Sequence, residues 1–184
     1  MARRGARTAE YVTVLRTLWA GGLTEFSGEF YELPRSTVAP VPVQPGGPPI
    51  LLGGLARPAL ERAGRIADGW VTSSRTDLTR IAEGVGVIRA AASGAGRDPD
   101  ALRIVCRGVV RAGAEAPGPG GDGRRLLSGS PGQIREDTRW LAGQGVTEIF
   151  YDLNWDPLVG APDADAAGAA ARAEQILEGL APGR

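Results

Sequence analysis

Residues 48–74 constrain the fold of this chain more than any other stretch, because they contain the pattern of a strand, a helix and a second strand. The apolar run 50–52 is typical of a buried strand, and a glycine pair follows it. Apolar side chains then recur at helical spacing over 58–66, and an extended apolar run begins at residue 70. Because the connection between the two runs is long enough for a helix, the stretch predicts a parallel βαβ unit.

Gly53 and Gly54 lie at the carboxyl end of the first of these strands, beside the N-terminus of the expected helix. Because glycine has no side chain, its peptide N–H can approach an anion closely, and the helix dipole favours negative charge at that end. This pattern is typical of a phosphate site. The same glycines also suit an ordinary tight turn between a strand and a helix, and the residues alone leave both interpretations open.

Length and composition restrict the classes of function. The 184 residues suffice for one domain with a sizeable core, and 21 cationic residues balance 21 acidic ones, which gives no electrostatic reason to expect nucleic acid binding. All the cations are arginine, so Schiff-base and imidazole catalysis by this chain are excluded. Cys106 is the single cysteine, which fits a reducing cytoplasm. No apolar run approaches the roughly 18 residues of a membrane span, so we expect a soluble protein.

The remaining sequence continues the alternation of helices and strands. Helical periodicity occurs over 8–20, 76–94, 130–143 and 163–180, with N-caps expected at Thr8, Thr76 and Ser130. Extended runs occur over 102–111 and 146–153. Between these elements we expect a small hairpin over 23–33, a proline-rich surface loop over 34–49 and a flexible segment over 112–123.

The sequence motif of residues 48–74 resembles that of the luciferase-like monooxygenase family, whose members are flavin- and deazaflavin-dependent (β/α)8 barrels. The family carries Pro-Pro-Ile, a strand and Gly-Gly, and then an alanine-rich helix that ends in Asp-Gly-Trp, as the segment AGRIADGW does here over 63–70. Further matches occur in LRTLW, in FSGEFYEL over 26–33, in GRDP over 96–99, and over 129–133 and 145–147. The chain is most similar to the branch that uses coenzyme F420. The flavin mononucleotide branch shares many of the same motifs.

This resemblance implies an α/β fold: a partial (β/α)8 TIM barrel of about four parallel βα units, preceded by a helix and a long loop. We expect residues 1–184 to form a single barrel domain. Because a full barrel takes about 250 residues, the N-terminal half of the barrel is expected to be missing, and we assign no catalytic residue. A half barrel would leave strand edges exposed, which are prone to pair with another chain. We therefore expect one of two situations: a partner covers the edges, as a homodimer or as a complementing N-terminal half, or the sequence has a truncated start.

For the coenzyme, the resemblance places four residues against the phosphate through main-chain contacts: Gly53, Gly54, Ala59 and Leu60. Two more residues separate the glycines from Pro58 here than in some members, so residues 55–57 are expected to share that role. More weakly, Thr72 and Arg75 match positions that bind a phosphorylated substrate; the alternative is that residues 72–74 only end a strand and cap a helix.

The other polar groups near strand ends belong to the two later strands. Arg107, on the arginine-bearing face of the strand 102–111, has two interpretations: it reaches an anionic ligand, or it is solvated or paired with a carboxylate. Residues 151–155, with Asp152 among them, bring polar and aromatic groups to the edge where parallel barrels keep their active sites. No metal site is expected.

The function that the resemblance implies is an F420-dependent oxidoreductase that transfers a hydride between the deazaflavin and a small organic substrate. A flavin mononucleotide (FMN)-dependent monooxygenase of the same fold is the alternative enzyme. A non-catalytic coenzyme-binding or dimerisation module is the alternative of another class, because fold analogy alone does not settle function.

Overall fold

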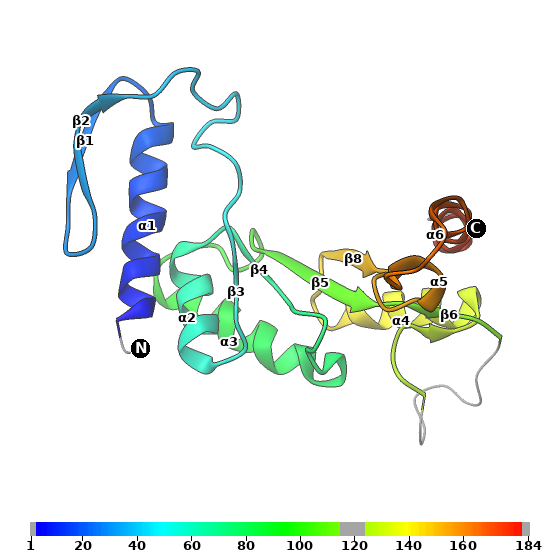
Figure 1. Ribbon diagram of the computed structural model, residues 1–184. Coiled ribbons are helices and arrows are strands. Elements are labelled where there is room, and N and C mark those ends of the chain that lie inside the picture. The colour runs from blue at the N-terminus through cyan, green and yellow to red at the C-terminus, as the bar shows by residue number, and fades with distance from the viewer. Residues whose placement is uncertain (1–2, 115–123, 182–184) are drawn as a thin grey trace. The chain divides into compact units, whose positions relative to one another are not determined.

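The computed structural model describes residues 3–114 and 124–181 (Figure 1). The chain forms two compact units. Unit 1 contains Met1–Trp70 and Gly86–Arg103, and unit 2 contains Val71–Val85 and Ile104–Arg184. The expectation of flexibility over 112–123 falls mostly on 115–123, which lie outside the described residues.

The predicted βαβ unit is present. Strand β3 (Leu51–Gly53) leads into α2 (Arg57–Ile66), which leads into β4 (Gly69–Val71). With β5 (Arg103–Val109) and β8 (Glu148–Asp152), these strands form a four-stranded sheet of order β3-β4-β5-β8. Strands β5 and β8 run parallel, with Cys106 opposite Ile149 and Gly108 opposite Tyr151. The strand order, with helices between successive strands, is that of a parallel α/β fold.

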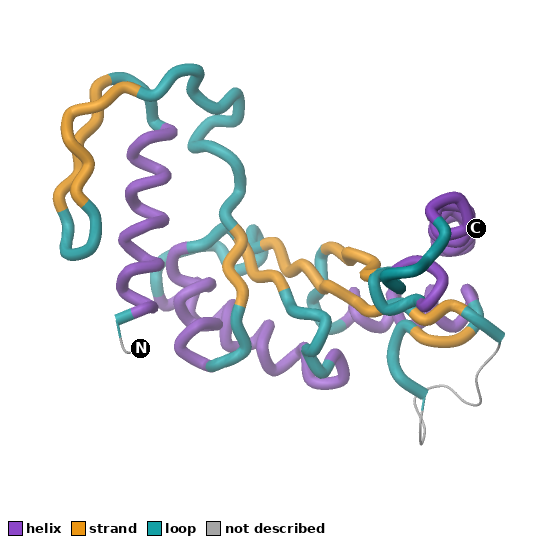
Figure 2. Tube along the Cα trace, in the orientation of Figure 1, coloured by secondary structure: helices purple, strands orange, loops and turns teal. Residues whose placement is uncertain are grey.

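Unit 1 begins with α1 (Arg4–Trp19), which ends at two glycines with positive φ, and continues into an antiparallel hairpin of β1 (Leu23–Ser27) and β2 (Glu32–Thr37). The hairpin is longer than expected and takes in the start of the proline-rich segment. Residues 38–50 then reach β3 without a helix or a strand (Figure 2). The carboxylate of Glu10 on α1 accepts hydrogen bonds from the amides of Glu29, Phe30 and Tyr31, which fastens the hairpin turn to the helix.

A close approach of backbones holds α2 against the later part of α3 (Ile81–Gly94). A Cβ at Gly64 on α2 would collide with the carbonyl oxygen of Ile88 and lie 2.9 Å from the Cβ of Ala91. Within unit 1, Asp68 ties the end of α2 to two other segments. Its carboxylate accepts hydrogen bonds from the amide of Ile50 at 2.8 Å and from the guanidinium of Arg16 at 3.0 Å.

The helix before β5 starts differently from the expectation. A short 3₁₀ helix, η1 (Leu78–Arg80), precedes α3, and its N-cap is Asp77, whose carboxylate accepts from the amide of Thr79. Thr76, the expected N-cap, instead accepts a hydrogen bond from the amide of Ser73 at 3.0 Å. The expected cap was therefore wrong by one residue, because Thr76 already closes the preceding turn.

In unit 2, three helices follow β5 along the chain, and they are named α4, α5 and α6. Helix α4 (Pro131–Gly143) begins at the predicted cap, where Ser130 and Gln133 form a complete capping box. Three short elements were not expected from the sequence: the parallel pair β6 (Arg111–Ala112) and β7 (Ser128–Gly129), and the helix α5 (Pro157–Gly160). Helix α6 (Ala166–Leu180) follows with Asp165 as its N-cap.

The largest fully buried side chains in unit 2 come from β5, α4 and the segments beside them, and one of them is charged. They are Ile81, Ile104, Cys106, Val110, Leu127, Ile134, Leu141 and Asp152. Since a buried carboxylate needs hydrogen-bond or ion-pair partners, Asp152 indicates a polar site at the end of β8. None of the helices in the described residues combines the length and the apolar character that crossing a membrane requires.

Candidate functional site

The turn between β3 and α2, in unit 1, contains the glycine pair. Gly54 has φ of +122°, and a Cβ there would lie 2.7 Å from the Cβ of Ala59, so glycine is needed for both conformation and space. The carbonyl oxygen of Gly54 accepts a hydrogen bond of 2.9 Å from the indole of Trp70 on β4. The turn is thereby held in place and remains exposed over 53–58.

The amides of this turn differ in whether they have partners. The N–H groups of Ala59 and Leu60 donate to the carbonyl oxygen of Ala56, at 2.8 and 3.1 Å. Within the described part of the chain, Gly54, Leu55 and Ala56 donate no backbone hydrogen bond, and α2 has no side-chain N-cap. The unoccupied donors therefore lie in the turn before the helix, and the roles expected for Gly53, Gly54, Ala59 and Leu60 stay predictions.

A second group of polar side chains lies at the carboxyl ends of β4, β5 and β8, in unit 2. Asp152, the last residue of β8, is 1% exposed. Its Oδ2 accepts hydrogen bonds from the hydroxyl of Ser74 at 2.6 Å and from Nε of Arg107 at 3.0 Å. Its Oδ1 accepts from the backbone and side-chain amides of Asn154 at 3.1 and 2.9 Å. The turn after β4, strand β5 and the end of β8 thus contribute to one hydrogen-bonded cluster.

These partners keep Asp152 ionised. Burial by itself raises the pKa of the carboxyl group, whereas the hydrogen bonds from Ser74 and Arg107 lower it, and the net result is a pKa below the ordinary value of 3.8. The carboxylate is therefore a fixed negative charge at neutral pH and fits the role of orienting Arg107 better than that of a proton donor.

The structure places the three weaker site predictions in this cluster or next to it. The hydroxyl of Thr72 is buried and accepts a hydrogen bond of 2.8 Å from the amide of Arg107. Arg107 is paired with a carboxylate, which was the second of its two interpretations, yet its side chain is 39% exposed. Arg75 is exposed on the segment after β4.

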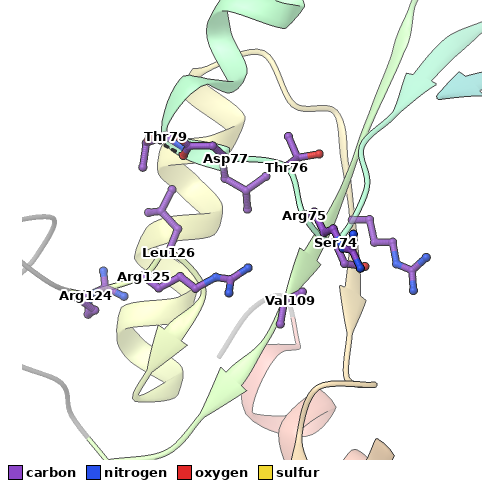
Figure 3. A pocket seen from close by; sticks show the side chains of 11 residues that line it. Ser74, Arg75, Thr76, Asp77, Thr79, Val109, Arg124, Arg125 and Leu126 are labelled. Carbon is purple, nitrogen blue, oxygen red and sulfur yellow. Dashed lines mark hydrogen bonds between the residues drawn. The ribbon is translucent and has the colours of Figure 1, made fainter. Parts of the chain in front are cut away.

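A pocket of about 240 Å³ lies beside this cluster, within unit 2 (Figure 3). Residues 74–79 form one wall and residues 124–126 another, with β5 between them contributing Arg107 and Val109. Four of the lining residues are arginines, at 75, 107, 124 and 125, and one is an acid, Asp77. A pocket with this lining favours an anionic group.

Sequence reasoning did not assign Ser74, Arg124 or Arg125 to the site. The sequence indicates polar groups at the end of β8, but nothing in the local sequence indicates that Asp152 contacts Arg107, which is 45 residues away in the chain.

The single cysteine offers no alternative site. Cys106 is fully buried, and burial raises the pKa of its thiol to about 11, so the reactive thiolate is not formed at neutral pH.

The parallel strands, their intervening helices and the polar groups at the strands' carboxyl ends define an α/β protein of the barrel type, in which this edge carries the active site. The chain belongs to the luciferase-like monooxygenase family, whose model matches residues 1–117. The expected fold class, an α/β chain built as part of a TIM barrel, is confirmed.

Individual relatives agree with this family. An uncharacterised protein of Mycobacterium tuberculosis is 49% identical over 70 residues, which are 38% of this chain and 23% of that protein. An F420-dependent glucose-6-phosphate dehydrogenase of Nakamurella multipartita is 39% identical over 71 residues, 39% of this chain and 20% of that enzyme. The matched part therefore spans less than a quarter of the length of either relative.

A solved structure supports the fold over almost the whole chain. The coenzyme F420-dependent tetrahydromethanopterin reductase from Methanopyrus kandleri superimposes with a TM-score of 0.71 at 16% sequence identity. The superposition covers 94% of this chain and 61% of the reductase.

Proposed function

We propose that this chain belongs to an F420-dependent oxidoreductase that moves a hydride between the deazaflavin and a small organic substrate. The observation that carries the proposal is the exposed turn over 54–56, whose amides are without backbone partners among the described residues, at the N-terminus of an uncapped helix. The relatives whose names include F420 support the same coenzyme.

In this proposal the turn binds the coenzyme phosphate. When bound, F420 supplies the two-electron hydride chemistry, and the protein supplies binding and orientation. The amides of Gly54, Leu55 and Ala56 donate to the phosphate oxygens, and the dipole of α2 adds about 0.3–1 kcal/mol. The side chain of Trp70 holds the Gly54 carbonyl, which fixes the direction of the neighbouring peptide groups.

On the substrate side, we propose that the pocket of unit 2 binds an anionic group. Arg75 and Arg107 supply guanidinium groups at the carboxyl ends of β4 and β5, and Thr72 fixes the backbone of Arg107. Asp152 holds the guanidinium of Arg107 in one orientation, so that little conformational entropy is lost when an anion binds.

We further propose that a second polypeptide, either another copy or a complementing chain, pairs beside β8. In the described residues β8 has a neighbouring strand on one side only, and Phe150 on it is 54% exposed. The mass of the purified protein in solution tests this proposal, because a value of one 19.1 kDa chain would contradict it.

Titration with coenzyme tests the main proposal. We expect F420 to change the tryptophan fluorescence with saturation, because Trp70 contacts the turn, and Gly54→Ala to weaken F420 binding at least tenfold. Gly86→Ala is the matched control, since nothing lies within 4 Å of its added methyl group. Saturation by FMN alone would replace F420 with the flavin, and no response to either coenzyme would overturn the proposal.

A further inference from the structure

The turn and the short helix that follow β8 line another pocket in unit 2, of about 570 Å³. Residues 155–158 form one wall, α6 forms another through Arg172, and β6 forms the third with Arg111 and Ala112. Helices α5 and α6 pack against each other here (Figure 1). The pocket shares no lining residue with the one between residues 74–79 and 124–126. Its volume lies in the range of small-molecule sites, about 300–1,000 Å³.

One buried ion pair holds the three walls together. Oδ2 of Asp156 lies 3.1 Å from Nε of Arg172, and the two side chains are 6% and 22% exposed. Arg172 also donates through Nη2 to the carbonyl oxygen of Ala112 at 2.6 Å, which ties α6 to β6. The charge of Arg172 is therefore neutralised, and its role is to fix the shape of the pocket.

The N-terminus of α5 has no donor left for an anion. Pro157 has no N–H, and the amide of Leu158 donates to Asp156 Oδ1 at 2.9 Å. The amides of Val159 and Gly160 donate to the carbonyl oxygen of Asp156, at 3.0 and 2.8 Å. A phosphate at this helix end would meet the Asp156 carboxylate instead of N–H groups. The pocket therefore does not suit a phosphate, whose oxygens need several donors.

Two large apolar side chains are exposed on the wall formed by residues 155–158. Trp155 is 52% exposed and Leu158 is 63% exposed, and both line the pocket. The sites described above make no use of Trp155. Because the indole has a large apolar face and only two rotatable side-chain bonds, its contact with a flat ligand costs little conformational entropy. The wall therefore favours an aromatic ring.

The wall formed by β6 supplies one cation without a counterion. Arg111 is exposed, and within residues 3–114 and 124–181 it takes part in no ion pair. Its backbone is fixed, because its amide donates to the carbonyl oxygen of Leu127 at 3.0 Å. Asp156, the one acid among the described lining residues, is already neutralised by Arg172. A single unpaired guanidinium beside an apolar wall matches a ligand with an apolar body and one carboxylate, which a guanidinium binds through two parallel hydrogen bonds.

We propose that this pocket binds an aromatic monocarboxylate. The ring of the ligand lies against Trp155 and Leu158, and its carboxylate accepts hydrogen bonds from Arg111. Asp156 and Arg172 are positioning residues, because they hold the turn that carries Trp155 against β6. This site goes beyond the proposed coenzyme and substrate groups and does not depend on them.

Calorimetric titration of the full chain with 2-naphthoate tests the proposal. The comparison compounds are 2-naphthamide, which has the ring without the charge, and acetate, which has the carboxylate without the ring. We expect saturable binding of 2-naphthoate, and binding of both comparison compounds that is weaker by about tenfold or more. Trp155→Ala should weaken 2-naphthoate binding by about tenfold or more, as the loss of a central tryptophan does in other contacts. Arg111→Gln should weaken 2-naphthoate binding by a similar factor and leave 2-naphthamide binding unchanged.

Two exposed residues of α4 outside the pocket lining supply matched controls. Trp140→Ala removes an indole that is 42% exposed, and Arg139→Gln removes an exposed guanidinium. Neither change should alter the binding of any of the three compounds. Trp155→Phe keeps an aromatic ring, so it should recover most of the binding that Trp155→Ala loses, which separates the role of the ring from a defect in folding.

The inference is overturned if the wild-type chain does not bind 2-naphthoate, or if the wild type and Trp155→Ala bind it equally. A loss of the same size in Trp140→Ala would show adsorption to exposed indoles and would also overturn it. Equal losses for 2-naphthoate and 2-naphthamide in Arg111→Gln would contradict the assigned class of ligand. Titration with F420 tests the turn before α2 in unit 1, so its failure would contradict the oxidoreductase proposal and leave this site standing.

Discussion

Asp152 is buried as an anion because its neighbours replace the water it loses. Ser74 and Arg107 donate to one carboxylate oxygen, and Asn154 donates two hydrogen bonds to the other. Each partner comes from a different segment: the turn after β4, the middle of β5 and the loop after β8. A single residue therefore joins three segments of unit 2, and its charge links the stability of unit 2 to pH.

Replacing Asp152 with asparagine should lower the free energy of unfolding by about 1–3 kcal/mol at pH 7. The amide is uncharged and has one acceptor oxygen, so it can accept from Ser74 and Arg107 or from Asn154, but not from both sides. Since the pKa of Asp152 in the folded state lies below the ordinary value of 3.8, its contribution is complete above that value and is lost as the pH falls through the folded-state pKa. Urea unfolding at pH 7 and pH 3 measures the difference.

The exposed Asp163 supplies the control for this comparison. Asp163→Asn should change the free energy of unfolding by less than about 0.5 kcal/mol at either pH. A gap between wild type and Asp152→Asn that is as large at pH 3 as at pH 7 would contradict the assigned ionisation.

At the scale of elements, packing of glycine sets the distance between α2 and α3. Gly64→Ala should destabilise the protein by about 1–3 kcal/mol, because its methyl group collides with the carbonyl of Ile88 and the helices must separate. Gly94→Ala, at the end of α3 with no atom within 4 Å, should be neutral or stabilising by up to about 1 kcal/mol. Thermal unfolding of the two variants decides between packing and helix propensity, since propensity alone would stabilise both.

Elements with strong local signals could be predicted from the sequence. Ser130, Pro131 and Gln133 determine the start of α4 through contacts within one turn, and the turn from β3 to α2 follows from its glycines. Pieces of two to four residues, such as β6, β7 and α5, are too short for a period to be detected.

Where long-range contacts decide, the sequence was a poorer guide. Helical periodicity over 8–20 indicates a helix but not which side chains it buries. Tyr11 on α1 is 48% exposed and packs its ring on Tyr31 of the hairpin, while Val12 and Val14 are buried. The pairing of Arg107 with Asp152 likewise depends on the register of β5 and β8, in which residues 107 and 109 face 150 and 152. The site's composition was partly predictable, whereas its connections required the fold.

At the scale of the whole molecule, the two compact units are not joined by linkers. The chain passes from one unit to the other within β4, within α3 and within β5, between residues 70 and 71, 85 and 86, and 103 and 104. Domain boundaries normally fall in exposed segments with few contacts. A helix or strand that belongs to both units cannot lose its structure in one of them without fraying into the other.

This connectivity predicts that unfolding is cooperative across the chain. In native-state hydrogen exchange, Gly64→Ala in unit 1 should lower the protection free energy of the amides of α4 in unit 2 by about as much as it lowers that of α2. Gly94→Ala should leave both protections unchanged or slightly raised. If α4 keeps its full protection while α2 loses its own, the units open independently. In that case the turn before α2 and the pocket between residues 74–79 and 124–126 belong to separately unfolding parts, and a ligand bound at the turn would stabilise unit 1 alone against exchange.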